Sequence, residues 1–311
     1  MHVYYCDHFE LPLPEGHRFP VEKYALARRL TRDRLNEDVR FLAGAAVTRE
    51  ELSRVHSSEY LDKVFEGRLS RLEEKRIGLP WSEKMLERCR RSTGATLAAS
   101  KEALASGAAA HLSGGTHHAF RDEGQGFCVF NDVAVASLDL LEAGRVENVL
   151  VVDLDVHQGN GTADIFRDDE RVFTFSMHGD RNYPFRKMAG DLDIGLPDGL
   201  GDKGYLSLLL DALEHSVPQK PDAVFYIAGA DPYEGDRMGR VKLTKEGLAE
   251  RDRVVLEFCF ARNCPVTVVM GGGYGPVVDV AEIHANTIEM AYNHWLCIQR
   301  KSAGPSWSEV R

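Results

Sequence analysis

The stretch VENVLVVDLDVHQGNGT, residues 146–162, contains a predicted buried strand and, directly after it, an unusual group of polar residues. Its first half is a nearly continuous apolar run, which is typical of a strand covered on both faces of a parallel sheet. Similar runs occur at Arg171–His178, Ala223–Asp231 and Pro265–Gly272. These four segments predict the centre of one parallel sheet.

The rest of the chain places helices between the strands. Shorter strands are predicted at Val3–Cys6 and near Ala108–Leu112. Strands that alternate with helices indicate βαβ units, so we predict an α/β fold: a single domain with a central parallel β-sheet flanked by helices on both faces. We expect this domain to span residues 1–301, with a long surface loop at Met188–Lys203 and a loose C-terminal tail at residues 302–311. The predicted helices are Pro20–Leu30, Ser82–Ser106, Val129–Ala143, Gly204–His215, Thr244–Ala261 and Pro276–Cys297.

The composition narrows the class of protein. The 311 residues include 48 acidic side chains and 38 Lys or Arg, which gives a formal net charge of −10. This balance argues against direct binding to nucleic acid or to an anionic membrane, and no apolar run reaches the roughly 18 residues of a membrane span. Residues 1–17 lack the basic and apolar regions of a signal peptide. The six cysteines are scattered without a CxxC pair, which is typical of a cytoplasmic protein with buried thiols. The sequence indicates no oligomeric state.

Polar residues at the ends of the predicted strands form a candidate metal site. Ligands of open α/β sheets bind at the carboxyl ends of the strands, and Asp155 and His157, two positions apart on an extended segment, point the same way. A carboxylate oxygen with an imidazole nitrogen suits zinc, iron or cobalt better than calcium or magnesium. Asp231, at another strand end, is a candidate third ligand, which would leave a fourth position open for catalysis. The alternative is an acidic cluster that caps the next helix or binds solvent.

Two adjacent histidines and a tyrosine are candidate catalytic groups. His117 and His118 follow a predicted strand, and a histidine pair beside a metal-bound water would serve general base and acid catalysis; the alternative is a surface loop that happens to carry two histidines. Asp153 and Asn160 flank the candidate ligands and would fix the histidine tautomers. Tyr274 follows three glycines, which let the backbone pass close to a ligand, so its hydroxyl is a candidate oxyanion donor. An ordinary turn or a phosphate-binding loop is the alternative there, although the spacing matches no phosphate-binding fingerprint.

Five ordered motifs then point to a family. In order and spacing they resemble the zinc-dependent histone deacetylase family of the arginase/deacetylase superfamily, and the similarity covers essentially the whole chain. The forms QGNG and GADPYEGDRMGR resemble most closely the class IV branch and its bacterial relatives. The motifs are GGTHHA (Gly114–Ala119), GFCVFND (Gly126–Asp132), VVDLDVHQGNGT (Val151–Thr162), GADPYEGD (Gly229–Asp236) and GGGYG (Gly271–Gly275).

The resemblance implies a zinc-dependent amidohydrolase that removes acetyl or longer acyl groups from lysine side chains by attack of a metal-activated water. It implies that Asp155, His157 and Asp231 hold Zn²⁺, with Fe²⁺ as the alternative in the cell. It also implies that His118 is the general base, that His117 pairs with Asp153 while Asn160 stands beside His118, and that Tyr274 donates to the amide oxygen. The substrate-binding residues it implies are Gly126, Phe127, Tyr183, Met238 and Gly272. A structural K⁺ or Na⁺ is implied near Asp153, Asp155, His157, Ser176 and Met177, with a second ion near the Phe166–Val172 turn.

Three positions depart from the family pattern. Asn160 stands where many members have Asp, so His118 should be less basic. Thr116 replaces a bulkier aromatic residue, which should widen the back of the site. Lys23 falls near the position of an arginine that lines the acetate-release cavity in some relatives.

The substrate has two candidate classes. A protein acyl-lysine and a small acylated amine such as an acetylpolyamine both present a secondary amide on an alkyl chain. Polyamine-directed relatives carry an acidic residue seven positions after the third metal ligand, where this chain has Met238, and this difference favours acyl-lysine. A catalytically weak acyl-lysine binding module is the alternative of another class, and only Asn160 suggests it.

Overall fold

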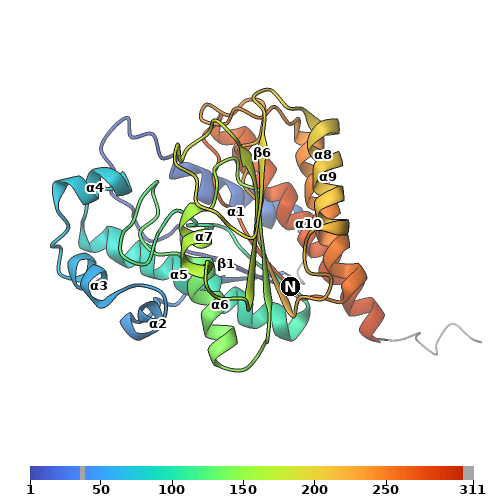
Figure 1. The fold of residues 1–311 in the computed structure, drawn as a ribbon, viewed down its shortest axis with the longest axis horizontal. Coiled ribbons are helices and arrows are strands. Elements are labelled where there is room, and N and C mark those ends of the chain that lie inside the picture. Colours follow the sequence, from blue (N-terminus) through green and yellow to red (C-terminus); the bar gives the residue numbers. More distant parts are fainter. Residues whose placement is uncertain (36–38, 304–311) are drawn as a thin grey trace, which may run out of the picture.

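The computed structural model describes residues 1–35 and 39–303. Within them, eight parallel strands form one sheet in the order β2-β1-β3-β8-β7-β4-β5-β6. This arrangement confirms the predicted α/β fold with a central parallel sheet (Figure 1). The strands are β1 (His2–Tyr5), β2 (Arg40–Ala43), β3 (Ala108–His111), β4 (Val149–Asp153), β5 (Val172–Gly179), β6 (Leu192–Leu196), β7 (Ala223–Ile227) and β8 (Val266–Val269).

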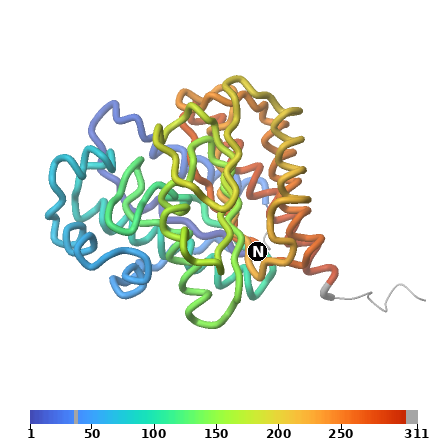
Figure 2. The backbone as a smooth tube through the Cα atoms, in the orientation of Figure 1, coloured from blue at the N-terminus to red at the C-terminus, as the bar shows by residue number. Residues whose placement is uncertain are grey.

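Helices cover both faces of the sheet. Side chains of α1, α8, α9 and α10 share one hydrophobic core, and those of α2 to α6 share a second core. Figure 1 shows α8 and α9 on one side of the sheet and α5 and α6 on the other. Figure 2 shows the same division along the chain, with the cyan α3–α4 region at the far left and the orange and red helices at the right. The helices are α1 (Glu22–Arg34), α2 (Arg49–Ser53), α3 (Ser58–Phe65), α4 (Arg71–Ile77), α5 (Glu83–Ser106), α6 (Asp132–Glu142), α7 (Asn160–Phe166), α8 (Asp202–His215), α9 (Lys245–Arg262) and α10 (Val277–Ala303).

The burial of the central strand β4 on both faces explains why its first four residues are apolar. Successive side chains of a strand point to opposite faces, so Leu150 and Val152 enter the core beneath α8–α10 while Val149 and Val151 enter the core beneath α5 and α6. All four side chains are buried. Because β7 lies beside β4 in the sheet, the polar residues that follow these two strands emerge next to each other at one edge.

Two strands at the edges of the sheet were not predicted. The segment Met188–Lys203, expected to be a surface loop, contains β6, which pairs with β5. Before the buried Leu196, its residues alternate between half-buried and exposed, so it lacks the continuous apolar run of a central strand. The other edge strand, β2, has no fully buried side chain and gives an equally weak signal.

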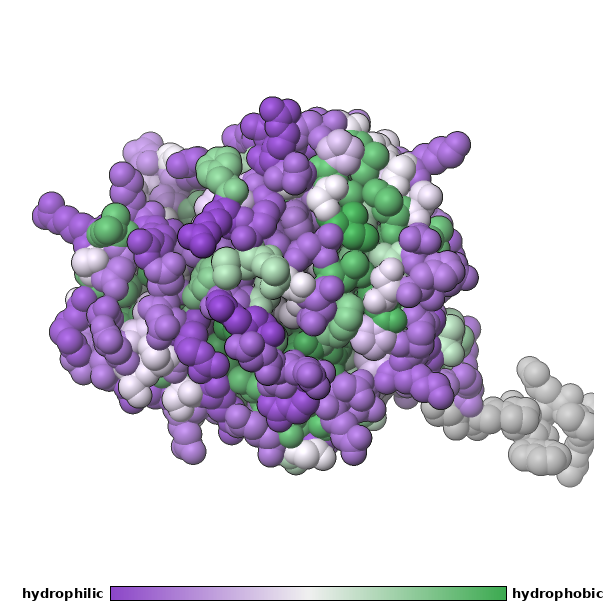
Figure 3. All heavy atoms as spheres, in the orientation of Figure 1, coloured by the Kyte–Doolittle hydropathy of each residue, from purple (hydrophilic) through white to green (hydrophobic). Residues whose placement is uncertain are grey.

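In the described part of the chain, no helix is long and apolar enough to cross a membrane. The face in Figure 3 is mostly hydrophilic, and apolar side chains gather in the region of α8, where Leu208 and Leu210 are exposed. Helix α10 runs to Ala303, two residues into the stretch expected to be a tail; residues 304–311 of that predicted tail lie outside the described residues.

Candidate active site

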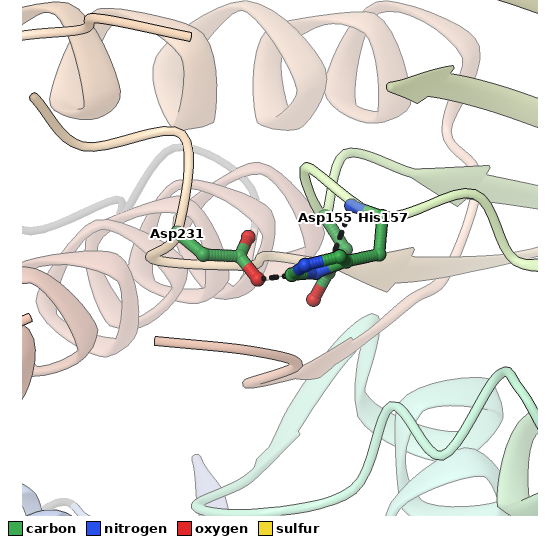
Figure 4. Close-up of side chains that lie close together, drawn as sticks. All are labelled: Asp155, His157 and Asp231. Carbon is green, nitrogen blue, oxygen red and sulfur yellow. Dashed lines mark hydrogen bonds and ion pairs between the residues drawn. The ribbon is translucent and has the colours of Figure 1, made fainter. Parts of the chain in front are cut away.

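The three predicted metal ligands converge at the carboxyl ends of β4 and β7. Asp155 and His157 follow β4, and Asp231 follows β7, the neighbouring strand. Their ligand atoms all lie within 4.8 Å of one another, and all three residues are buried. His157 Nδ1 lies 3.0 Å from Asp155 Oδ1 and 3.0 Å from Asp231 Oδ2 (Figure 4). The ligand atoms of the three side chains therefore converge on one position.

The environment of this cluster fits a divalent cation. Backbone N–H groups orient both carboxylates: Gly272 donates to Asp155 Oδ2 at 2.6 Å, and Val156 donates to Asp231 Oδ1 at 2.8 Å. Burial and the nearby charge of Asp155 raise the pKa of Asp231 to about 7. The raised pKa means that the protein alone provides too little positive charge to keep both carboxylates ionised. A bound cation would supply that charge. One imidazole nitrogen and two carboxylate oxygens are a donor set suited to zinc or iron.

The histidine pair lies directly beside the ligand cluster, in the loop after β3. His117 Nδ1 is 2.6 Å from Asp153 Oδ2, and His118 Nδ1 is 2.7 Å from Asn160 Oδ1. Each oxygen accepts a hydrogen bond from the Nδ1–H group. Nε2 is therefore the nitrogen of each ring that remains available on the cavity side. The structure thus brings together the predicted pairs His117–Asp153 and His118–Asn160.

The two histidines differ in their electrostatic surroundings. Burial opposes the charged form of His117, but Asp153 and Asp155 outweigh it and raise its pKa to about 9. Burial, together with the neighbouring His117 and His157, lowers the pKa of His118 well below its usual range. Residues whose pKa values are pushed apart in this way are suited to separate acid and base roles. His118 is the member of the pair that stays neutral.

Tyr274 faces this centre from the glycine loop after β8. Its ring centroid lies 6.0 Å from that of His157, and burial with the nearby Asp155 raises the pKa of its hydroxyl well above the usual range. The hydroxyl therefore stays protonated as a donor. Asp236 accepts the Tyr274 backbone N–H at 2.6 Å, and Arg237 Nε donates to the Tyr274 carbonyl at 2.8 Å. Asp236 was not singled out in the sequence, although it lies in the GADPYEGDRMGR motif.

The predicted substrate-binding residues fall into an inner and an outer set. Gly126, Phe127 and Gly272 line the same cavity as the histidines and Tyr274. A Cβ on Gly126 would lie 2.6 Å from His118 Cδ2, so a larger residue does not fit there. Tyr183 packs edge-on against His118, with ring centroids 5.0 Å apart, and Met238 lines an adjoining outer groove that shares Tyr274 with the inner cavity.

The residues expected around a monovalent cation lie on β4, on β5 and just after β4. Asp153 pairs in register with Ser176, and Met177 is the next residue of β5. The side chain of Asp153 also accepts the backbone N–H of Asp155 at 3.1 Å. Ion binding at these residues, and near the Phe166–Val172 turn, stays a prediction.

Two buried charged residues support the loops of the site, and one of them, Asp132, was missed in the sequence. Asp132 at the start of α6 accepts the backbone N–H groups of Gly115 and Thr116, at 3.1 and 2.8 Å, and so holds the loop that carries the histidines. Its place in the GFCVFND motif was the available signal. Lys23, expected near the back of the site, is buried beneath the glycine loop and donates to the Gly273 carbonyl at 3.3 Å.

Comparison with known proteins identifies the family. The model of the histone deacetylase domain matches residues 17–290. The chain belongs to the histone deacetylase family. This confirms the resemblance drawn from the five motifs.

The chain is similar to members of this family over different lengths. An uncharacterized protein of Picosynechococcus sp. is 43% identical over 94% of this chain and 95% of its own length. Histone deacetylase 2 of Arabidopsis thaliana is 34% identical over 67% of this chain and 54% of its own length, so the match spans about half of that protein. The crystal structure of an HDAC homolog complexed with SAHA superimposes with a TM-score of 0.79 at 24% identity, covering 94% of this chain and 83% of the homolog, and supports the fold.

Proposed function

We propose that this histone deacetylase family member is a metal-dependent amidohydrolase that removes acyl groups from lysine side chains. The observation that carries the proposal is the convergence of a three-residue metal donor set, a histidine pair with opposed pKa shifts and a protonated tyrosine on one cavity. The name of the Arabidopsis relative, histone deacetylase 2, supports the same reaction class.

The metal would be held by Asp155, His157 and Asp231. When bound, zinc supplies a Lewis acid that lowers the pKa of a coordinated water and polarises a carbonyl oxygen. The carboxylate–imidazole donor set supports zinc, and iron(II) is the alternative with the same ligands.

The chain's own residues handle the protons. His118, neutral and held through Nδ1 by Asn160, accepts a proton from the attacking water at Nε2. His117, charged and paired with Asp153, stabilises the negative charge that develops nearby and provides a proton for the leaving lysine amine. The Tyr274 hydroxyl donates a hydrogen bond to the oxyanion, an interaction whose removal typically costs about 100- to 1000-fold in rate.

The walls of the cavity support an acyl-lysine over a polycationic substrate. Phe127 and Tyr274 line the inner cavity, and their rings give it an apolar wall that suits the methylene stem of lysine. Beyond it, Met238 and Arg237 line the outer groove, and an arginine there repels the extra ammonium groups of an acetylpolyamine.

The test is amine release from an acetyl-lysine peptide and from N-acetylspermidine, each with the zinc-loaded protein and with chelator-treated protein. We expect turnover of the peptide that chelation abolishes, and at least about tenfold lower kcat/KM for the polyamine. Turnover of neither compound by protein shown to contain zinc would contradict the proposal and would favour a binding module. Preferential turnover of the polyamine would reverse the substrate assignment.

A further inference from the structure

The active-site cavity is also lined by a buried arginine. Its walls include Asp155, His157 and Tyr274 together with Arg88 and Ser92 of α5. Its volume is about 70 Å³, which exceeds the space of one or two waters. An acyl group whose carbonyl lies at the metal ligands therefore enters a cavity that Arg88 also lines.

Arg88 is a buried cation without a counter-ion in the described residues. Arg88 is only 6% exposed. Its Nη1 donates to the backbone carbonyls of Cys6 at 2.8 Å and Phe9 at 3.1 Å. Within residues 1–35 and 39–303, no carboxylate lies within 4.0 Å of its guanidinium, and Nε and Nη2 have no hydrogen-bond partner. Among the described residues the other buried arginine, Arg251, is paired with Asp252 at 2.8 Å. A buried charge is costly unless it is paired, so Arg88 lacks a partner that Arg251 has.

The surroundings of Arg88 suit an anion with oxygen acceptors. Ser92 Oγ and Ser113 Oγ lie 3.5 Å apart, and both residues line the cavity with Arg88, to which they add two hydroxyl groups. The Tyr24 ring lies 5.2 Å from the guanidinium carbon and closes one side. A guanidinium with free Nε and Nη2 donors matches the two oxygens of a carboxylate. The two serine hydroxyls and the unpaired guanidinium charge of Arg88 disfavour binding of the apolar end of a hydrocarbon acyl chain.

We propose that Arg88 binds a carboxylate at the far end of the acyl group, so that this protein hydrolyses ω-carboxyacyl-lysines such as malonyl-, succinyl- or glutaryl-lysine. The proposal rests on the proposed amidohydrolase function and names its acyl substrate. In the reaction, water adds to the amide carbon, the C–N bond breaks, and the lysine amine takes the proton. The products are the free lysine side chain and the dicarboxylate.

The first test compares two acyl groups of the same shape. Succinyl-lysine and 4-methylpentanoyl-lysine peptides have the same heavy-atom skeleton, but only the first ends in a carboxylate. With zinc-loaded protein we expect kcat/KM to be roughly 10- to 100-fold higher for the succinyl peptide, the range of hydrogen bonds to a charged group. Malonyl- and glutaryl-lysine then give the chain length that reaches Arg88.

The second test changes the arginine. In Arg88→Met the ratio of kcat/KM for the succinyl peptide to kcat/KM for the 4-methylpentanoyl peptide should fall by roughly 10- to 100-fold. Arg88→Lys keeps a point charge, so its ratio should lie between those of Arg88→Met and the wild type. Because both rates come from one sample, partial unfolding cancels in the ratio. Arg90→Met is the matched control, since Arg90 lies on the same helix but donates to the Val47 carbonyl and does not line the cavity; its ratio should equal that of the wild type.

The two proposals fail in different ways. Hydrolysis of acetyl-lysine with no preference for the succinyl group, or a preference unchanged in Arg88→Met, would overturn the role of Arg88 and leave the amidohydrolase standing. Inhibition by acetate that depends on Arg88, without succinyl turnover, would likewise overturn it, because the arginine would then bind only the released product. If no acyl-lysine is hydrolysed, the amidohydrolase itself fails, and the substrate assignment falls with it.

Discussion

Replacing Arg251 with methionine should weaken metal binding although Arg251 contacts no metal ligand side chain. Arg251 lies on α9, is fully buried, and donates through Nη1 to the Gly229 carbonyl at 2.6 Å and the Leu154 carbonyl at 3.3 Å. Leu154 precedes Asp155, and Gly229 lies two residues before Asp231. One side chain therefore ties together the two strand ends that carry the metal ligands.

The magnitude follows from what the substitution leaves behind. Asp252 accepts from Arg251 Nε and Nη2, from the Tyr226 hydroxyl and from Thr287 Oγ1. Removing the cation leaves this buried carboxylate without its counter-charge, which typically costs about 3–5 kcal/mol of unfolding free energy. Loss of support behind metal ligands typically costs about 10- to 100-fold in metal affinity.

Urea denaturation and competition with a zinc chelator measure the two effects. Arg251→Met combined with Asp252→Asn should recover part of the stability, because no buried charge then lacks a partner. Arg253→Met is the control on the same helix; its ion pairs with Glu250 and Glu257 are exposed and worth about 1 kcal/mol or less. A loss below about 1 kcal/mol in Arg251→Met, with unchanged zinc affinity, would refute the reasoning.

Four further outcomes are expected. Tyr274→Phe should lower kcat for an acyl-lysine peptide about 100- to 1000-fold with little change in stability; a loss under tenfold would exclude an oxyanion role. Asn160→Asp places a carboxylate on His118 and should move the acid limb of the pH–rate profile up by about 1 to 3 units; an unmoved limb would mean that His118 is not the base. Gly126→Ala should reduce turnover at least about tenfold, because its Cβ meets His118 and the backbone φ is +56°; wild-type kcat/KM in this variant would show that the gap is not required. Burial lowers the pKa of His56 to about 4 from 6.5. Between these two pH values the unfolded chain therefore binds more protons than the folded protein. The free energy of unfolding should fall by about 2.5 kcal/mol between pH 7 and 4.5 through this residue alone. Urea titrations of His56→Gln should show a correspondingly smaller acid loss, and equal losses in variant and wild type would contradict the assignment.

The parts of the fold that local sequence determines were predicted well. A strand buried on both faces is typically apolar along its length, as β7 is throughout and β4 is from Val149 to Val152. The polar residues after those strands interrupt the pattern, which is why Asp155, His157 and Asp231 stood out. The edge strand β6 has only Leu196 fully buried, with half-buried and exposed residues alternating before it, so it lacks such a pattern.

The residues behind the site could not be predicted, because their roles depend on packing between distant segments. Arg88, Arg90 and Arg91 stand close together on one helix, and nothing in the sequence tells which of them is buried. Only the tertiary structure turns Arg88 toward the cavity, with Cys6 and Phe9 above it. Phe127, at φ +67°, is a similar case, since few non-glycine residues adopt this conformation and no local motif requires it.

The most direct test of the account is metal reconstitution with activity as the readout. Protein stripped of metal should hydrolyse an acyl-lysine peptide at background rate, and turnover should rise linearly with added zinc up to one equivalent per chain. Asp231→Asn should bind zinc more weakly and recover little activity at one equivalent. Full turnover in the stripped protein, or a zinc-loaded protein that leaves every acyl-lysine peptide intact, would contradict the central claim.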